Sequence, residues 1–296
     1  MKKALLLSFF LWTISSAMSV SACPGVSAWQ EHSRTDPYGN NFSLYSYRRW
    51  PSYLPGYYLD PQVVVLNGGT GGVDCNNTAM YNAIGNKASY YWRQAITLDL
   101  NYWANGRNTI QQAASYVVAT LNKLVNEGYL RPNFYLMGGS AGSAVISAAL
   151  DHHPSFMDRV ERAIFVSGPF TDIARAEVTT GNTVAQLMDS YGITRLDSLD
   201  ISMPYDPTRY NQWIKPIMDK KGLRFFVAED DDVFCEPSSC SAGTMYEEFL
   251  NWVSIATDDT ENRASLENLG VLWVYPQGGH DLFNTHPELL NDAFAP

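Results

Sequence analysis

The stretch of this sequence that most constrains its fold is 133–150, where an apolar segment breaks into small residues and then turns apolar again. Its middle, residues 138–142, reads Gly-Gly-Ser-Ala-Gly. This pattern predicts a buried strand that turns sharply into a helix, with Ser140 at the turn. Such a turn strains the backbone of its central residue, and glycines two positions before and after it leave the necessary room. The hydroxyl of Ser140 would then project beside a helix N-terminus.

Other apolar segments indicate a sheet around this turn. Edge β-structure is expected between Pro24 and Gly56. Strands are expected at 42–47, 62–66, 95–100, 162–168, 223–228 and 271–275. Helices are expected at 109–127, where apolar residues recur at helical spacing, and at 183–191 and 245–255. Strands that alternate with helices predict an α/β fold, with a mostly parallel central sheet flanked by helices.

Two segments fall outside this alternation. Residues 1–22 have the pattern of a signal peptide, with two lysines, an apolar run too short to span a bilayer, and a small-residue cleavage site. Residues 169–218 are polar and contain prolines, so we interpret them as a cap inserted over the sheet, with ordinary peripheral packing as the alternative. We therefore expect residues 23–296 to form a single domain of a secreted or periplasmic protein.

The four cysteines bear on the same compartment. Cleavage before Cys23 would leave Cys23, Cys75, Cys235 and Cys240, an even number that suits disulfides in an oxidising compartment. The short separation favours a Cys235–Cys240 pair, with Cys23 and Cys75 as the second. Residues 20–23, Val-Ser-Ala-Cys, also resemble the bacterial lipobox, so a lipoprotein anchored through Cys23 is the alternative.

Composition narrows the possible partners. The chain has a net charge of −10, and removal of the segment with Lys2 and Lys3 would bring it to −12. So acidic a protein lacks the basic surface that nucleic acid or an anionic membrane requires. No transmembrane run is expected after residue 22. No cofactor or metal is expected either, because no Cys/His cluster has zinc spacing and Asp74 stands where a dinucleotide fingerprint needs its third glycine.

Three chemically apt residue types follow three of the expected strands. They are Ser140, the acidic run 229–232 after the strand that ends at Ala228, and His280 after the last strand. The loops at the carboxyl ends of parallel strands converge at one edge of a sheet. There, a neutral imidazole can take a proton from a serine hydroxyl and return it, while a carboxylate fixes the imidazole tautomer.

With these residues, the chain from Gln62 to Phe283 resembles the α/β-hydrolases of the esterase and lipase kind. Residues 138–142 match Gly-x-Ser-x-Gly, and Gly-His-Asp at 279–281 resembles the histidine loop of those enzymes. Residues 67–72, Asn-Gly-Gly-Thr-Gly-Gly, stand where they often carry His-Gly-Gly-Gly. The chain order serine, acid, histidine is also theirs. The resemblance implies the α/β-hydrolase fold and a serine hydrolase.

The roles then fall to particular residues. We expect Ser140 to be the nucleophile, His280 the base and Asp231, three residues after its strand, the acid. Asp230 is the second choice for the acid, Asp232 stays open, and a solvated acidic turn is the alternative for the whole run. The expected oxyanion donors are the backbone N–H groups of Gly69, Thr70 and Ala141.

The sequence thus favours an exported serine hydrolase that cleaves carboxylic esters of neutral or apolar small molecules or polymers through an acyl-enzyme on Ser140. An exported peptidase or amidase with the same residues is the second interpretation, and a non-catalytic binding protein on this fold is the third. The remaining histidines are expected to be bystanders, at a surface turn for His152 and His153 and without spaced partners for His32 and His286. Asn67 in place of a histidine and Ser143 in place of a second glycine leave the subfamily unassigned.

Overall fold

The structure, a computed structural model, describes residues 28–47, 61–66, 77–101, 110–168, 222–231 and 263–296. Several expectations lie outside these ranges. They are the signal peptide at 1–22, the cap at 169–218, the glycine loop at 67–72, the helices at 183–191 and 245–255, and all four cysteines.

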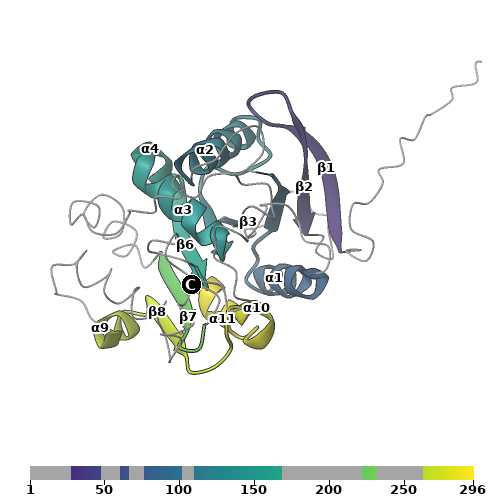
Figure 1. The fold of residues 1–296 in the computed structure, drawn as a ribbon. Coiled ribbons are helices and arrows are strands. Elements are labelled where there is room, and N and C mark those ends of the chain that lie inside the picture. Colours follow the sequence, from purple (N-terminus) through teal and green to yellow (C-terminus); the bar gives the residue numbers. More distant parts are fainter. Residues whose placement is uncertain (1–27, 48–60, 67–76, 102–109, 169–221, 232–262) are drawn as a thin grey trace, which may run out of the picture.

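Within the described residues, one eight-stranded sheet runs in the order β1-β2-β4-β3-β5-β6-β7-β8 (Figure 1). Its strands are β1 Trp29–Thr35, β2 Asn41–Tyr47, β3 Gln62–Leu66, β4 Ala95–Asp99, β5 Phe134–Gly139, β6 Val160–Val166, β7 Leu223–Ala228 and β8 Leu272–Tyr275. β1 and β2 form an antiparallel hairpin, and β2 joins β4 antiparallel. The other five pairings are parallel, which confirms the mostly parallel sheet.

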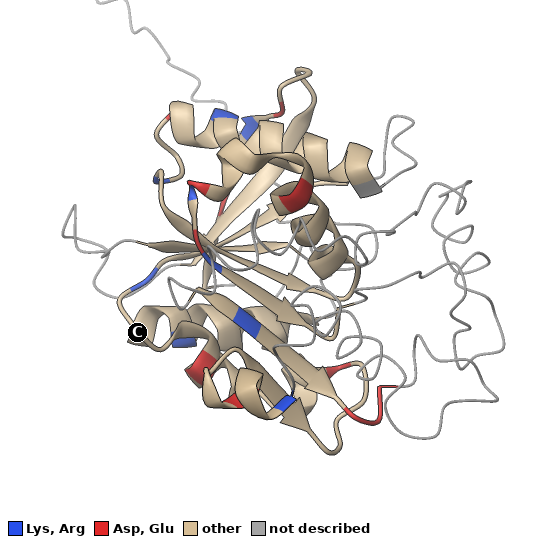
Figure 2. Cartoon of the chain, turned by 90° about the vertical axis from the view of Figure 1, so that its left-hand side faces the viewer, with Lys and Arg blue, Asp and Glu red and all other residues tan. Residues whose placement is uncertain are grey.

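The helices that the structure describes cover both faces of the sheet (Figures 1 and 2). They are α1 Thr78–Tyr90, α2 Ile110–Asn126, α3 Ala141–His152, α4 Pro154–Met157, α9 Arg263–Asn268, α10 Leu282–Thr285 and α11 Leu289–Phe294. None of them is both long enough and apolar enough to cross a membrane. A layered α/β architecture follows, as the alternation of strands and helices predicts.

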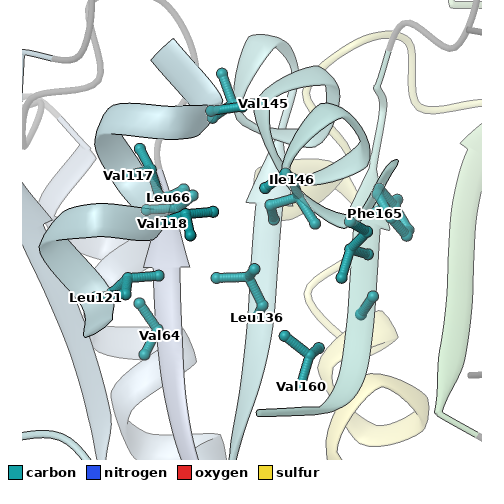
Figure 3. Packing of buried hydrophobic residues seen from close by; sticks show 14 of the residues in the cluster. Val64, Leu66, Val117, Val118, Leu121, Leu136, Val145, Ile146, Val160 and Phe165 are labelled. Carbon is teal, nitrogen blue, oxygen red and sulfur yellow. The ribbon is translucent and has the colours of Figure 1, made fainter. Parts of the chain in front are cut away.

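Strand alternation divides the core between the two faces. On one face, Val64 and Leu136 pack with Val117 and Leu121 of α2 and with Ile146 of α3 (Figure 3). The residues that alternate with them along the strands face α1, α10 and α11. These strands are buried on both faces, which explains their continuous apolar sequences.

The strand boundaries differ from expectation at one functionally relevant place. The sequence predicted a strand at 162–168, but β6 begins at Val160 and ends at Val166. Ser167 adopts φ +46°, a left-handed conformation that a strand does not tolerate. β6 therefore stops beside the turn that contains Ser140.

Candidate active site

Ser140 joins the end of β5 to the start of α3 with φ +49° and ψ −128°. A positive φ is uncommon outside glycine, and holding it costs about 1–3 kcal/mol. Neighbouring backbone groups hold the turn. The N–H of Ser140 donates to the carbonyl of Val166 at 3.0 Å, and the N–H of Ser143 donates to the carbonyl of Ser140 at 2.9 Å. The expected strained strand-to-helix turn is therefore present.

Gly138 and Ser143 explain how the strand and the helix approach each other so closely. A β-carbon on Gly138 would lie 2.7 Å from the carbonyl carbon of Gly142 and from the nitrogen of Ser143. Only glycine fits there. The buried hydroxyl of Ser143 donates to the carbonyl of Gly138 at 2.8 Å. Ser143, which in the sequence only departed from a common pattern, thus fastens the turn that holds Ser140.

Asp231 follows β7 and faces His280. Its carboxylate oxygens lie 2.9 Å and 3.2 Å from Nδ1 of His280, and the residue is only 4% exposed. A carboxylate accepts hydrogen bonds, so Nδ1 carries the proton and Nε2 is left as the basic nitrogen. The structure thus brings together the two residues that the sequence had paired.

Asp230 contacts the same loop but not the imidazole. Its two carboxylate oxygens accept the N–H groups of Gly279 at 2.8 Å and of Gly278 at 3.2 Å. Both glycines have positive φ, at +139° for Gly278 and +59° for Gly279, so the loop curls around this carboxylate. Among the acids considered from the sequence, Asp231 holds the imidazole, Asp230 holds the backbone, and Asp232 lies outside the described residues.

The loop with His280 lies close to the turn with Ser140. A β-carbon on Gly139, the residue before Ser140, would come within 2.8 Å of the ring of Phe283. Phe283 belongs to α10, three residues after His280. Since β5, β7 and β8 run parallel, their carboxyl ends meet at one edge of the sheet, and the three residues follow these ends.

Comparisons with known proteins bear on this arrangement. No protein-family model and no curated protein sequence matches the chain. An esterase of Pyrococcus furiosus matches in structure with a TM-score of 0.54 at 12% identity, over 90% of this chain and 91% of that one. The fluorophosphonate-binding serine hydrolase F of Staphylococcus aureus matches with a TM-score of 0.53 at 14% identity, over 90% of this chain and 96% of that one. Carboxyl esterase 2 of the fungus Tuber melanosporum matches with a TM-score of 0.52 at 16% identity, over 96% and 90%. This chain has the α/β-hydrolase fold.

In the α/β-hydrolase fold the nucleophile stands on the strand-to-helix turn, with the acid and the histidine later in the chain. Ser140 stands on such a turn here, and Asp231 and His280 follow it in the chain in that order. Of the expected oxyanion donors, Ala141 is the first residue of α3, where backbone N–H groups lack partners within the helix. Gly69 and Thr70 lie outside the described residues.

Other histidines were expected to be bystanders, and three of them lie away from the turn with Ser140 in the sequence and bond to other residues or face solvent. His152 is exposed at the end of α3, His153 bonds to the hydroxyl of Ser115 at 2.9 Å, and His32 bonds to that of Ser46 at 3.1 Å. Across the described ranges, no three metal-ligating side chains form a group that would hold an ion.

His286 makes two hydrogen bonds that the sequence did not predict. Its ring bonds to the carboxylate of Glu288 and to the backbone carbonyl of Gln277. A carboxylate two residues away is too common a neighbour to indicate a contact, and a backbone carbonyl is present at every residue. Gln277 belongs to the loop between β8 and α10 that leads to His280.

Proposed function

We propose that this protein is a serine hydrolase that cleaves carboxylic esters through an acyl-enzyme on Ser140. The observation that carries the proposal is the carboxylate of Asp231 at 2.9 Å from Nδ1 of His280, on a loop whose helix packs against the residue before Ser140. Solved structures of the same fold that are esterases or serine hydrolases support the reaction class.

The chemistry divides into two steps. In the first, Nε2 of His280 takes the proton of the Ser140 hydroxyl while the oxygen attacks the ester carbon. The tetrahedral intermediate collapses, the bond to the alcohol breaks, and His280 returns the proton to the leaving oxygen. In the second, His280 takes a proton from water, the hydroxide attacks the acyl carbon, and Ser140 recovers its proton as the acid leaves.

Two further groups lower these barriers. Asp231 keeps Nδ1 as the donor and stabilises the imidazolium that forms in each step. The backbone N–H of Ala141, with those of Gly69 and Thr70, is proposed to bind the negative oxygen of the intermediate. Each such donor stabilises the transition state by about 3 kcal/mol.

The substrate is proposed to be a neutral or apolar ester, small or polymeric. The net charge of −10 repels polyanions, and basic residues are scattered over the described part of the chain in Figure 2 without forming a broad basic face. We also propose that the protein is exported after removal of residues 1–22, and that its four cysteines form two disulfides. Anchoring through an acylated Cys23 is the alternative.

A fluorophosphonate probe and a panel of p-nitrophenyl esters test the reaction. Ser140→Ala should abolish labelling and lower kcat on the order of a thousandfold or more, because the nucleophile is gone. Ser115→Ala is the matched control, since it removes an exposed serine hydroxyl on α2. Full ester turnover by Ser140→Ala would show that the assignment is wrong.

A further inference from the structure

His286 sits directly after α10 with both ring nitrogens bonded to acceptors. Nδ1 lies 2.8 Å from a carboxylate oxygen of Glu288, and Nε2 lies 2.7 Å from the carbonyl oxygen of Gln277. The hydrogen bond from His286 lowers the pKa of Glu288, so this carboxyl is ionised at neutral pH. Neither a carboxylate nor a carbonyl donates a proton. Both nitrogens therefore have to donate, and only the imidazolium does so.

The position of this ring links it to His280. The ring of His286 packs on the backbone of Gly278, where an added β-carbon would come within 2.8 Å of its Cδ2 atom. The neighbouring hydroxyl of Thr285 lies 3.1 Å from the carbonyl oxygen of Gly278. Asp230 accepts the N–H groups of Gly278 and Gly279 of the same backbone. The residues that lead to His280 are thus held by two sets of side chains.

We propose that His286 is a positioning residue for His280, and that its imidazolium holds the loop 277–280 in the orientation that catalysis needs. This inference rests on the serine hydrolase function proposed above. A neutral ring keeps a single proton and loses its bond either to Gln277 or to Glu288. Loss of the bond to Gln277 removes one support of the loop directly, and loss of the bond to Glu288 frees the ring that provides this support. In either case the imidazole of His280 shifts relative to Ser140.

The groups around the ring favour its charged form. Glu288 lies on the same segment as His286, and Asp230 faces the ring from the end of β7. The ring of Tyr275 in β8 contacts it with centroids 4.5 Å apart and planes tilted by 33°. The hydrogen bond to Glu288 is the largest cause that raises the pKa of His286, and partial burial opposes it. Burial together with Asp292 and Glu288 raises the pKa of Tyr275, which stays neutral.

An alkaline limb in the pH profile of kcat follows from the charge of His286. His286 has to be charged to hold the loop, which gives an alkaline limb at its raised pKa. Above that limb, kcat falls by up to about a hundredfold, the cost of misplacing a catalytic group by roughly an ångström.

Glu288→Gln is the sharpest variant, because Glu288 is 58% exposed and the exchange leaves Ser140, Asp231 and His280 untouched. Loss of the carboxylate removes the main cause of the raised pKa of His286. The alkaline limb of kcat should therefore move to lower pH, with KM nearly unchanged. The matched control is Glu127→Gln, which removes an exposed carboxylate 2.7 Å from Lys123 on α2 and should leave the profile in place.

His286→Gln separates this role from a merely structural one. A glutamine amide has one NH₂ group and no titration, so kcat should be lowered at all pH values and the alkaline limb should disappear. An unchanged alkaline limb in either Glu288→Gln or His286→Gln would overturn the proposal.

A readout without turnover separates this proposal from the proposed function. In Ser140→Ala protein labelled with ¹⁵N, the ring of His286 and the amides of Gly278 and Gly279 should report one common alkaline midpoint by NMR. Loop amides that ignore the titration of His286 would overturn the positioning role even in an active enzyme. If the common midpoint is found but wild-type protein turns over no ester, the proposed function fails and the positioning of the loop stands.

Discussion

Gly139 lies so close to Phe283 that a β-carbon on Gly139 would come within 2.8 Å of the phenyl ring. Gly139 precedes Ser140, and Phe283 follows His280 by three residues. This contact therefore sets the spacing between the turn of β5 and the loop that follows β8. The absence of a side chain at position 139 lets the helix α10, which follows His280, pack against this turn.

Gly139→Ala should lower kcat between about tenfold and a hundredfold, because the new methyl group pushes the Phe283 ring and the helix α10 outward. KM and the free energy of unfolding should change less, since an aromatic ring at the edge of the core can rotate away. Steady-state kinetics and denaturant unfolding measure the two effects. The double variant Gly139→Ala with Phe283→Leu should recover part of the loss, and additive losses would contradict the steric explanation.

Asp231→Asn and Asp230→Asn should differ greatly in their effect on kcat. Asp231→Asn places an amide at Nδ1 of His280 and disturbs its tautomer, which costs on the order of ten thousandfold. Asp230→Asn keeps one oxygen for the loop N–H groups and should cost about tenfold. Single-turnover rates on an activated ester measure both, and a larger loss for Asp230→Asn would exchange the two roles.

Ser143→Ala should destabilise the fold by about 1–3 kcal/mol, because it leaves the buried carbonyl of Gly138 without its 2.8 Å hydrogen bond. Urea unfolding measures the change. Ser115→Ala serves as the control, because its hydroxyl is exposed and its bond to His153 is a surface contact. Equal stabilities for the two variants would show that the Ser143 hydroxyl does not fasten the turn.

Arg224→Met should leave the stability at neutral pH unchanged or raise it. Arg224 is 7% exposed, and burial together with the nearby charge of Arg162 lowers its pKa to about 10. Because its pKa is lower in the folded state, the charged form opposes folding below that pH, and the opposition is relieved as pH rises through about 10. An apolar side chain of similar volume avoids the cost of burying this cation.

Arg162→Met gives the contrast within the same buried region. The guanidinium of Arg162 donates to the carbonyls of Ala293 at 3.0 Å and Ala295 at 2.6 Å, and so holds the C-terminal segment. Its loss should lower the free energy of unfolding by about 1–3 kcal/mol per carbonyl left buried. Thermal unfolding of both variants measures the difference, and a clear loss only in Arg224→Met would refute the argument.

Sequence alone predicted the parts of the fold that depend on strongly patterned burial. β3 and β7 have the predicted bounds, because strands covered on both faces need mostly apolar sequence. Helix α1 was not predicted. Gly85 and its asparagine neighbours obscure the helical pattern, and Gly85 is there because the ring of Tyr47 fills the space of its side chain. That constraint comes from a distant strand and leaves no local trace.

The candidate site also contains some residues that the sequence predicted and others that it did not. Ser140 and His280 were found from motifs, and Asp231 was preferred to Asp230 only by its distance from the strand. The structure separates the two acids by what they face, an imidazole for Asp231 and backbone N–H groups for Asp230. The direction of a side chain in a loop depends on tertiary contacts. His286 and Ser143 were missed for that reason, since each acts through a backbone carbonyl.

Asp230 and Asp231 are consecutive, and one contacts the backbone of a loop while the other contacts the imidazole on that loop. Any thermal movement of the end of β7 therefore carries both contacts in the same direction. His280 and the carboxylate of Asp231 therefore shift together, and the distance between Nδ1 and the carboxylate changes little when this edge of the sheet moves. A proton donor and acceptor placed on two independent loops would have no such protection.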